Sequence, residues 1–244
     1  AVPSIAGGFD PAEARELVER FFGPIPRGVG KPPLPPMNLP AHFGSWERLV
    51  VPDAVMLPRL FLGFRAPVFG SDAHYVATVL AAILGTGKGS RFQRVLVRDR
   101  EVASEASAFT FDLAKGADLL IADITARPGI SADALEAEVV REIDRLRTDG
   151  VTEDEVQRAV ALLETALVSS LQSAGDRADK LSMFATYFDD PALVTEQSDR
   201  YQRVTALQVT APEHDLLAED TRVSPLNRPA DGAPARAAAA TTGG

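Results

Sequence analysis

The stretch SDAHYVATVLAAILGTGKGSRFQRVLVRDREVASEASAF, residues 71–109, joins three local patterns in one run. Ser71 can cap a helix, and apolar residues then recur at helical spacing as far as Gly85. A second, shorter helical stretch covers Phe92 to Val97, and a strand of about Val102 to Leu113 follows it. A long helix, a glycine turn, a short helix and a strand in succession predict a sheet covered by helices.

The segments on either side extend this pattern. Two short apolar runs before it, Leu49 to Val51 and Leu60 to Phe64, predict strands interrupted by prolines. A strand of about Asp118 to Ala126 follows it, joined to the preceding strand by a hairpin turn at Lys115-Gly116. Three long helices are predicted next, the second of them with a capping box of Thr152 and Glu155, and a last helical pair is predicted between Leu193 and Leu217. Because strands and helices are grouped, the predicted fold class is α+β, an antiparallel sheet with helices packed on one face.

Changes in composition and the positions of proline and glycine divide the chain into four predicted parts. Residues 1–28 contain a helix opened by Asp10 and Pro11 and are predicted to be the end of a preceding domain. Residues 29–45 are rich in proline and glycine and are predicted to be a linker. Residues 46–226 form the main α+β domain, and residues 227–244 are a low-complexity tail expected to be disordered. The start lacks the pattern of a signal peptide and resembles the middle of a domain, so a longer precursor is expected.

Charge and composition exclude several classes of protein. The chain has 244 residues and a formal net charge of -9, which argues against nucleic-acid binding. It has no cysteine, which removes disulfides, cysteine-ligated zinc and thiol catalysis. No apolar run approaches the roughly 20 residues of a membrane span.

Motif searches predict no catalytic residue and no metal ligand. The three histidines, His42, His74 and His214, are far apart in sequence and belong to no His-x-x-Glu-His motif or its inverse. A zinc site built from distant histidines and carboxylates therefore has no support in the sequence. The glycine cluster at Gly85 to Gly89 departs from a phosphate loop because Ala82 stands where the first glycine is required, so a helix end and a tight turn are preferred. There is no Gly-x-Ser-x-Gly elbow for a nucleophilic serine.

Arginines are concentrated in the second half of the opening stretch. On an α-helix, Arg91, Arg94 and Arg98 would share one face, with Asp99 and Glu101 as local partners. A solvated face with weak ion pairs accounts for this pattern as well as a binding surface does. Residue chemistry alone leads only to an α+β domain without visible catalytic machinery.

The order of segments resembles the second half of a zinc metallopeptidase of the pitrilysin/insulinase type. The resemblance is carried by residues 72–109, by ITARPGISADALEAEVVREIDRLRTDGVTEDEVQRA at residues 124–159, and by GGFDPAEARELVERFFGPIPRG at residues 7–28, which is similar to the end of the first half. It implies two homologous halves that close around an unfolded peptide. The zinc motif belongs to the other half, so this half is expected to bind no zinc and to hydrolyse nothing by itself.

The resemblance also implies two substrate-binding positions. The family's arginine falls on Arg98, whose guanidinium offers fixed, permanently charged donors to substrate carbonyls. A tyrosine is expected six residues later, where this chain has Ser104, and a serine hydroxyl cannot reach as far.

The departure at Ser104 leaves a second function open. In the core subunits of the mitochondrial cytochrome bc complex, the same family fold serves as a non-proteolytic scaffold for assembly. The expected partners are a homologous half that bears the zinc motif, from the same precursor or a separate subunit, and an unfolded peptide. Because bacterial relatives are often exported, the periplasm or cell envelope is favoured over the cytoplasm.

Overall fold

The computed structural model describes residues 2–30, 45, 47–112, 116, 118–211, 216–218 and 222–229. The chain divides into two compact units. The smaller combines Ala1–Asn38 with Leu167–Glu196, and the larger combines Leu39–Ala166 with Gln197–Gly244.

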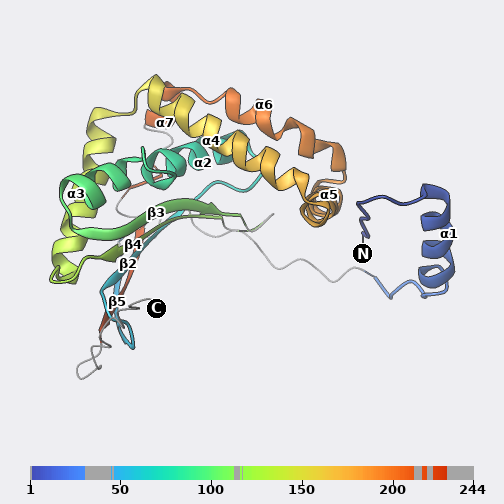
Figure 1. Cartoon of the computed structure of the whole chain (residues 1–244), viewed down its shortest axis with the longest axis horizontal. Helices are drawn as coiled ribbons and strands as arrows, with labels where there is room; N and C mark the ends of the chain where they lie inside the picture. Colours follow the sequence, from blue (N-terminus) through green and yellow to red (C-terminus); the bar gives the residue numbers. More distant parts are fainter. Residues whose placement is uncertain are drawn as a thin grey trace, which may run out of the picture. The chain divides into compact units, whose positions relative to one another are not determined.

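The larger unit is built on a five-stranded sheet with the order β1-β5-β2-β4-β3 (Figure 1). The strands are β1 (Glu47–Asp53), β2 (Arg59–Arg65), β3 (Ala103–Phe111), β4 (Leu119–Ala126) and β5 (Arg222–Pro229). The pairs β5–β2, β2–β4 and β4–β3 are antiparallel, whereas β1 pairs with β5 in parallel. The sheet is therefore antiparallel except at one edge.

Side chains alternate between the two faces of the sheet, and the two faces differ sharply. On one face the side chains of β2, β3 and β4 are fully buried, among them Leu60, Leu62, Phe64, Leu120 and Ile124. On the other face the alternate residues remain half-buried or exposed. The apolar face is covered by helices and forms the core, as expected for a sheet with one packed face.

Helix α2 (Asp72–Gly85) supplies most of the cover, together with α3 (Ala132–Asp149), and both lie on the same side of the sheet in Figure 1. Ser71 caps α2 by accepting a hydrogen bond from the backbone N–H of His74 at 3.3 Å. Gly85 allows the end of α2 to touch the sheet, because a Cβ there would lie 1.8 Å from the backbone nitrogen of Ala108. A glycine is thus required by close packing at this point.

The remaining helices complete the two units. In the larger unit, α4 (Glu153–Gln172) begins at a capping box formed by Thr152 and Glu155, and its last residues are counted with the smaller unit. The larger unit also contains α6 (Gln197–Gln202) and α7 (Ala206–Thr210), and the smaller contains α1 (Pro11–Phe22), α5 (Ala174–Phe188) and the 3-10 helix η2 (Pro191–Glu196). Among the described helices, none is both long and apolar enough to cross a lipid bilayer.

The α+β class and the helices on one face are confirmed, with two differences. Strand β5 was not predicted, and it enters the sheet between β1 and β2, in parallel with β1. It runs to Pro229, so the first three residues of the expected tail, residues 227–229, belong to the strand. Lys115 of the predicted hairpin turn and residues 230–244 lie outside the described part of the chain.

Candidate functional site

The segment that carries Arg98 is a π-helix, η1 (Gln93–Asp99), followed by a turn into β3. Its hydrogen bonds are wider than those of an α-helix: the N–H of Arg100 donates to the carbonyl of Val95 at 2.8 Å. The N–H of Val102 then donates to the carbonyl of Leu96 at 2.9 Å. Such wide turns change the direction in which successive side chains point.

The prediction that Arg91, Arg94 and Arg98 share a face is wrong for this reason. Arg91 precedes η1 and is buried, whereas Arg94 and Arg98 are exposed. The α-helical spacing of three and seven residues does not hold through a π-helical turn.

Arg91 forms a buried, two-point ion pair with Glu155. Its Nε and Nη2 atoms donate to the two carboxylate oxygens of Glu155 at 2.8 and 2.9 Å, and Nη2 also reaches the carbonyl of Gly150 at 2.7 Å. These bonds from Arg91, followed by those from Thr152, lower the pKa of Glu155 to about 2. The Glu155 carboxylate therefore has a structural role at the start of α4.

Arg98 lies at the other end of η1, and 63% of its side chain is exposed. Its Nε atom is 3.6 Å from Asp99, a loose contact that leaves most of the guanidinium facing solvent. The turn behind it is rigidly held, because Arg127 donates to the carbonyls of Val97 at 2.9 Å and Ala103 at 3.2 Å. An exposed arginine thus projects from a fixed base.

Ser104 lies at a register shift between Ala103 and Glu105 in β3. Its hydroxyl turns back to the neighbouring strand, where it is within 3.3 Å of the carbonyl of Thr125 and 3.2 Å of that of Ala126. The Ser104 hydroxyl is therefore used in hydrogen bonds within the sheet.

The uncovered face of the sheet carries apolar and charged side chains side by side. Phe109 is 43% exposed and Phe111 48% exposed at the β3 edge. Farther into the sheet, the Nε atom of Arg59 donates to Asp123 at 2.8 Å, and its guanidinium lies 4.9 Å from the centre of the Phe61 ring. This mixture suits a ligand with both apolar groups and backbone amides.

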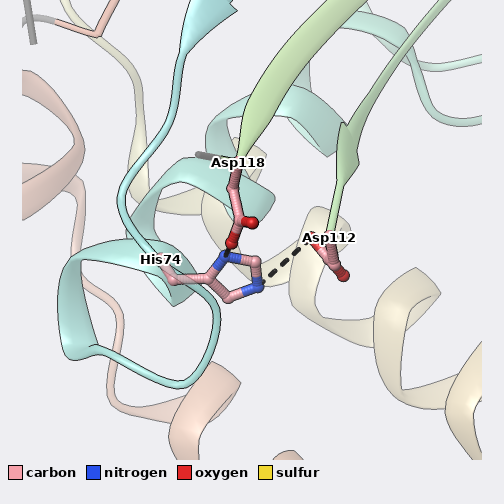
Figure 2. Close-up of side chains that lie close together, drawn as sticks. All are labelled: His74, Asp112 and Asp118. Carbon is pink, nitrogen blue, oxygen red and sulfur yellow. Dashed lines mark ion pairs between the residues drawn. The ribbon is translucent and has the colours of Figure 1, made fainter. Parts of the chain in front are cut away.

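A second constellation lies at the end of the β3–β4 pair, where His74 of α2 faces two carboxylates (Figure 2). The Nδ1 atom of His74 is 3.8 Å from Asp118, and its Nε2 atom is 3.6 Å from Asp112. His74 and Asp118 are fully buried, while 40% of the Asp112 side chain is exposed. One donor atom from each residue can be chosen so that the three atoms lie within 4.8 Å of one another.

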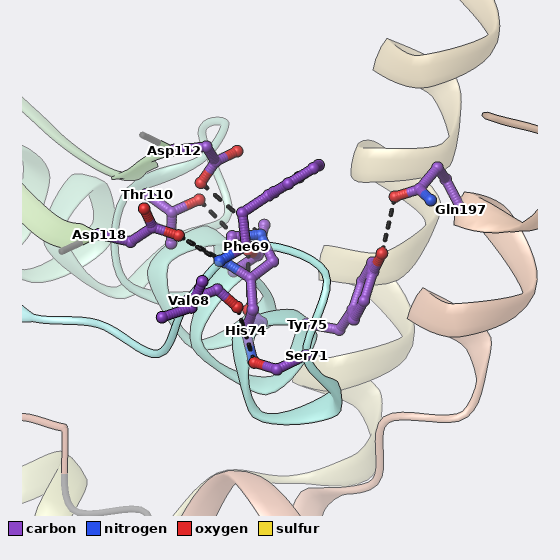
Figure 3. Close-up of polar contacts among 10 residues, drawn as sticks. Val68, Phe69, Ser71, His74, Tyr75, Thr110, Asp112, Asp118 and Gln197 are labelled. Atoms are coloured by element: carbon purple, nitrogen blue, oxygen red, sulfur yellow. Dashed lines mark hydrogen bonds and ion pairs between the residues drawn. The ribbon is translucent and has the colours of Figure 1, made fainter. Parts of the chain in front are cut away.

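Aromatic and hydroxyl side chains surround His74 (Figure 3). Its ring makes edge contacts with Phe69 and Tyr75, and Tyr75 donates to the side-chain oxygen of Gln197 at 2.8 Å. The pKa of Tyr201, which packs against Tyr75, is raised by burial and then by the negative charge of Asp112. The backbone N–H of Phe69 donates to the carboxylate of Asp118.

Sequence patterns did not predict this group of His74, Asp112 and Asp118, although His74 was one of the three histidines considered. The histidine and the aspartates are 38 and 44 residues apart, and only the packing of α2 on the β3–β4 pair brings them together. A usable signal was present, since Asp112 and Asp118 end and begin two strands predicted to be neighbours.

Residues 1–163 match the family described as "Peptidase M16 inactive domain". Over 189 residues the chain is 28% identical to the zinc protease PqqE of Helicobacter pylori. This alignment covers 77% of this chain and 41% of that protein. The chain thus spans about two fifths of the length of this relative.

Two solved structures have a similar fold. A protease from Helicobacter pylori superposes with a TM-score of 0.79 at 22% identity, covering 92% of this chain and 54% of that one. A peptidase M16 inactive domain from Pseudomonas fluorescens superposes with a TM-score of 0.72 at 19% identity, covering 91% and 51%. At these identities the likeness concerns the fold.

Proposed function

The chain belongs to the peptidase M16 family, as its inactive domain, and we propose that it is the non-catalytic half of a zinc endopeptidase. The inactive domain lacks the family's zinc motif. In this proposal a homologous half supplies the zinc, and this half closes the peptide chamber and helps to hold an unfolded peptide. The observation that carries the proposal is the match of residues 1–163 to an inactive domain, which assigns no zinc motif to this chain.

The uncovered face of the sheet supports peptide binding. It offers two exposed phenylalanines, Phe109 and Phe111, next to the Arg59–Asp123 ion pair. Apolar side chains that are exposed next to one another, with polar groups around them, are typical of interaction sites. An unfolded peptide can place apolar side chains against the rings and its amides against the ion pair.

Arg98 is proposed to bind a substrate carbonyl close to the scissile bond. Its exposed guanidinium has several donors in a fixed plane, and the Arg127 bonds hold the turn from which it projects. A positive group there also favours the negative charge that develops on a carbonyl oxygen during hydrolysis.

Residues 1–28 are proposed to be the end of the preceding half, with residues 29–45 as the linker. Helix α1 leaves a row of large apolar side chains exposed, and Phe21 and Phe22 are 65% and 60% exposed. The relative PqqE is nearly twice as long as this chain, because the 189 matched residues make up 41% of it, and this leaves room for a first half to cover that row.

The test combines this chain with its zinc-bearing half, zinc and an unfolded peptide. We expect Arg98→Ala to lower kcat/KM about 10-fold or more, because it removes a charged donor near the reacting carbonyl. Arg100→Ala is the matched control, since Arg100 is also half exposed and only 4.0 Å from Glu138. Equal rates for Arg98→Ala and the unmodified chain would show that Arg98 does not grip the substrate.

A second function, a scaffold without proteolysis, is favoured by Ser104. Its hydroxyl is used within the sheet, on the carbonyls of Thr125 and Ala126, and so supports structure at the position where a substrate-binding tyrosine is expected. A stable complex with a zinc-bearing half that cleaves no peptide would favour this function.

The periplasm or cell envelope is the proposed location. Fractionation of cells that express the full natural gene, with antibody to this domain, tests it directly. Recovery in the cytoplasmic fraction would overturn it.

A further inference from the structure

We propose that His74, Asp112 and Asp118 form a binding site for one divalent transition-metal ion, with Zn²⁺ as the ion that suits the ligands best. Imidazole and carboxylate groups are common ligands of Zn²⁺. The three donor atoms lie within 4.8 Å of one another, and they come from three separate places: α2, the end of β3 and the start of β4.

Hydrogen-bond donors around His74 decide which ring nitrogen carries a proton. Thr78 has one hydroxyl hydrogen, and it donates this to the backbone carbonyl of His74 at 3.0 Å. We therefore assign the 3.3 Å contact between the Thr78 hydroxyl and His74 Nε2 the other direction, with Nε2–H donating. The Thr110 hydroxyl lies 3.2 Å from the Thr78 hydroxyl, and in this assignment it donates to it.

The neutral ring therefore points the lone pair of Nδ1 into the buried side of the site. Within the described part of the chain Nδ1 is buried without a hydrogen-bond partner, and a carboxylate oxygen of Asp118 lies 3.8 Å from it. A lone pair opposite a buried carboxylate is unfavourable unless a positive species lies between them.

The distance favours a metal ion as that species. A proton shared by Nδ1 and Asp118 requires an N···O distance of about 2.7–3.2 Å. Two ligands each about 2.1 Å from one ion can be as much as about 4.2 Å apart. The observed 3.8 Å is too long for the hydrogen bond and within the span of a common ion.

Charge and second contacts agree with a dication. Two aspartates with a neutral histidine carry a formal charge of -2, which one divalent ion balances. The hydrogen bond from Nε2–H to Thr78 fixes the orientation of the His74 ring. Histidines that bind metals usually make such a bond with the nitrogen that does not bind the ion. Asp112, which is partly exposed, lies 3.6 Å from Nε2, so its carboxylate has to turn towards the Nδ1 side of the ring to become the third ligand.

A bound ion would tie α2 to the end of the β3–β4 pair. It is expected to stabilise the folded larger unit, because the unfolded chain does not hold the three ligands together. The proposal does not depend on the proposed function, since a scaffold and a peptidase half would both gain this stability.

The test is titration of the chelator-treated full chain with ZnCl₂, by calorimetry and by thermal unfolding. We expect one equivalent of Zn²⁺ to bind and to raise the Tm. Asp112→Asn and His74→Gln are expected to weaken binding by about 100-fold, and Thr78→Val by about 10-fold. Asp144→Asn, which removes an exposed aspartate of α3, is the matched control and should bind like the unmodified chain.

Two results would overturn the proposal. One is the absence of stoichiometric Zn²⁺ uptake by the folded chain. The other is uptake that both Asp112→Asn and His74→Gln leave unchanged, which would place the ion on other groups. Circular dichroism checks the fold of each variant, and Asp112→Asn decides the question if His74→Gln unfolds, because the partly exposed Asp112 tolerates an amide.

Discussion

Arg91 and Arg98 bracket the same short π-helix, and they have opposite environments. Arg91 is 8% exposed and makes three hydrogen bonds to Glu155 and Gly150. Arg98 has 63% of its side chain exposed and only a loose contact with Asp99. Arg91 is therefore buried in the protein, whereas Arg98 faces the solvent.

The difference shows how one segment can serve both stability and binding. The buried ion pair fixes the start of η1 to α4 and to the end of α3, so that the turn after η1 starts from a rigid support. An exposed guanidinium on such a support loses less freedom when it binds a ligand than one on a loose loop would. The two arginines therefore predict different responses to the same substitution.

Arg91→Ala is expected to have the largest effect on stability. Removing the arginine leaves the Glu155 carboxylate buried without its cation, and breaking a buried pair in this way costs about 3–5 kcal/mol. Urea unfolding followed by circular dichroism measures the change. A loss below about 1 kcal/mol would contradict a structural role for the pair.

The pH dependence of stability sharpens the comparison through Glu155. Its pKa is about 2 in the folded chain and 4.5 ordinarily, so on acidification the unfolded state takes up the proton first. The stabilisation is complete above pH 4.5 and is lost as the pH falls towards 2; it amounts to about 3 kcal/mol.

Unfolding of Glu155→Gln and the unmodified chain, compared between pH 7 and pH 2, measures this contribution. The stability difference between the two should shrink as the pH falls. Asp154→Asn, which alters an exposed carboxylate in the same helical turn, serves as the control. A difference that stays constant with pH would contradict the lowered pKa.

Ser104→Ala is expected to have a smaller effect, about 0.5–1 kcal/mol, because one hydroxyl donor to the β4 carbonyls is lost. Chemical denaturation is again the measurement. If stability is unchanged, the hydroxyl is not needed within the sheet and a role in substrate binding gains support.

Arg98→Ala is expected to change stability least, within about 0.5 kcal/mol, since its side chain is exposed. The same unfolding experiment measures it alongside Arg91→Ala. A loss as large as that of Arg91→Ala would mean that Arg98 is a structural residue and that the contrast between the two is mistaken.

Sequence patterns predicted the helices well because their signals are local. Asp10, Ser71 and the Thr152–Glu155 box cap the helices for which they were named. Strands β1 to β4 were also recognised, from short apolar runs. Strand β5 was missed because its apolar residues, Val223 and Leu226, do not alternate and Pro225 interrupts them.

Other features depend on packing that the sequence does not display. Nothing in the spacing of Arg91 and Arg98 reveals the π-helical turn that separates them. Likewise, the ligand constellation at His74 exists only after α2 has packed on the β3–β4 pair. Family resemblance drew attention to Arg98, but its orientation towards solvent is a product of the fold.

The central claim is that this chain is a partner half with no peptidase activity of its own. Cleavage of an unfolded peptide should be measured with zinc and this chain alone, the zinc-bearing half alone, and an equimolar mixture. We predict cleavage by the mixture at a rate well above that of either half, and none by this chain. Cleavage by this chain alone, or a mixture no faster than the zinc-bearing half, would contradict the claim.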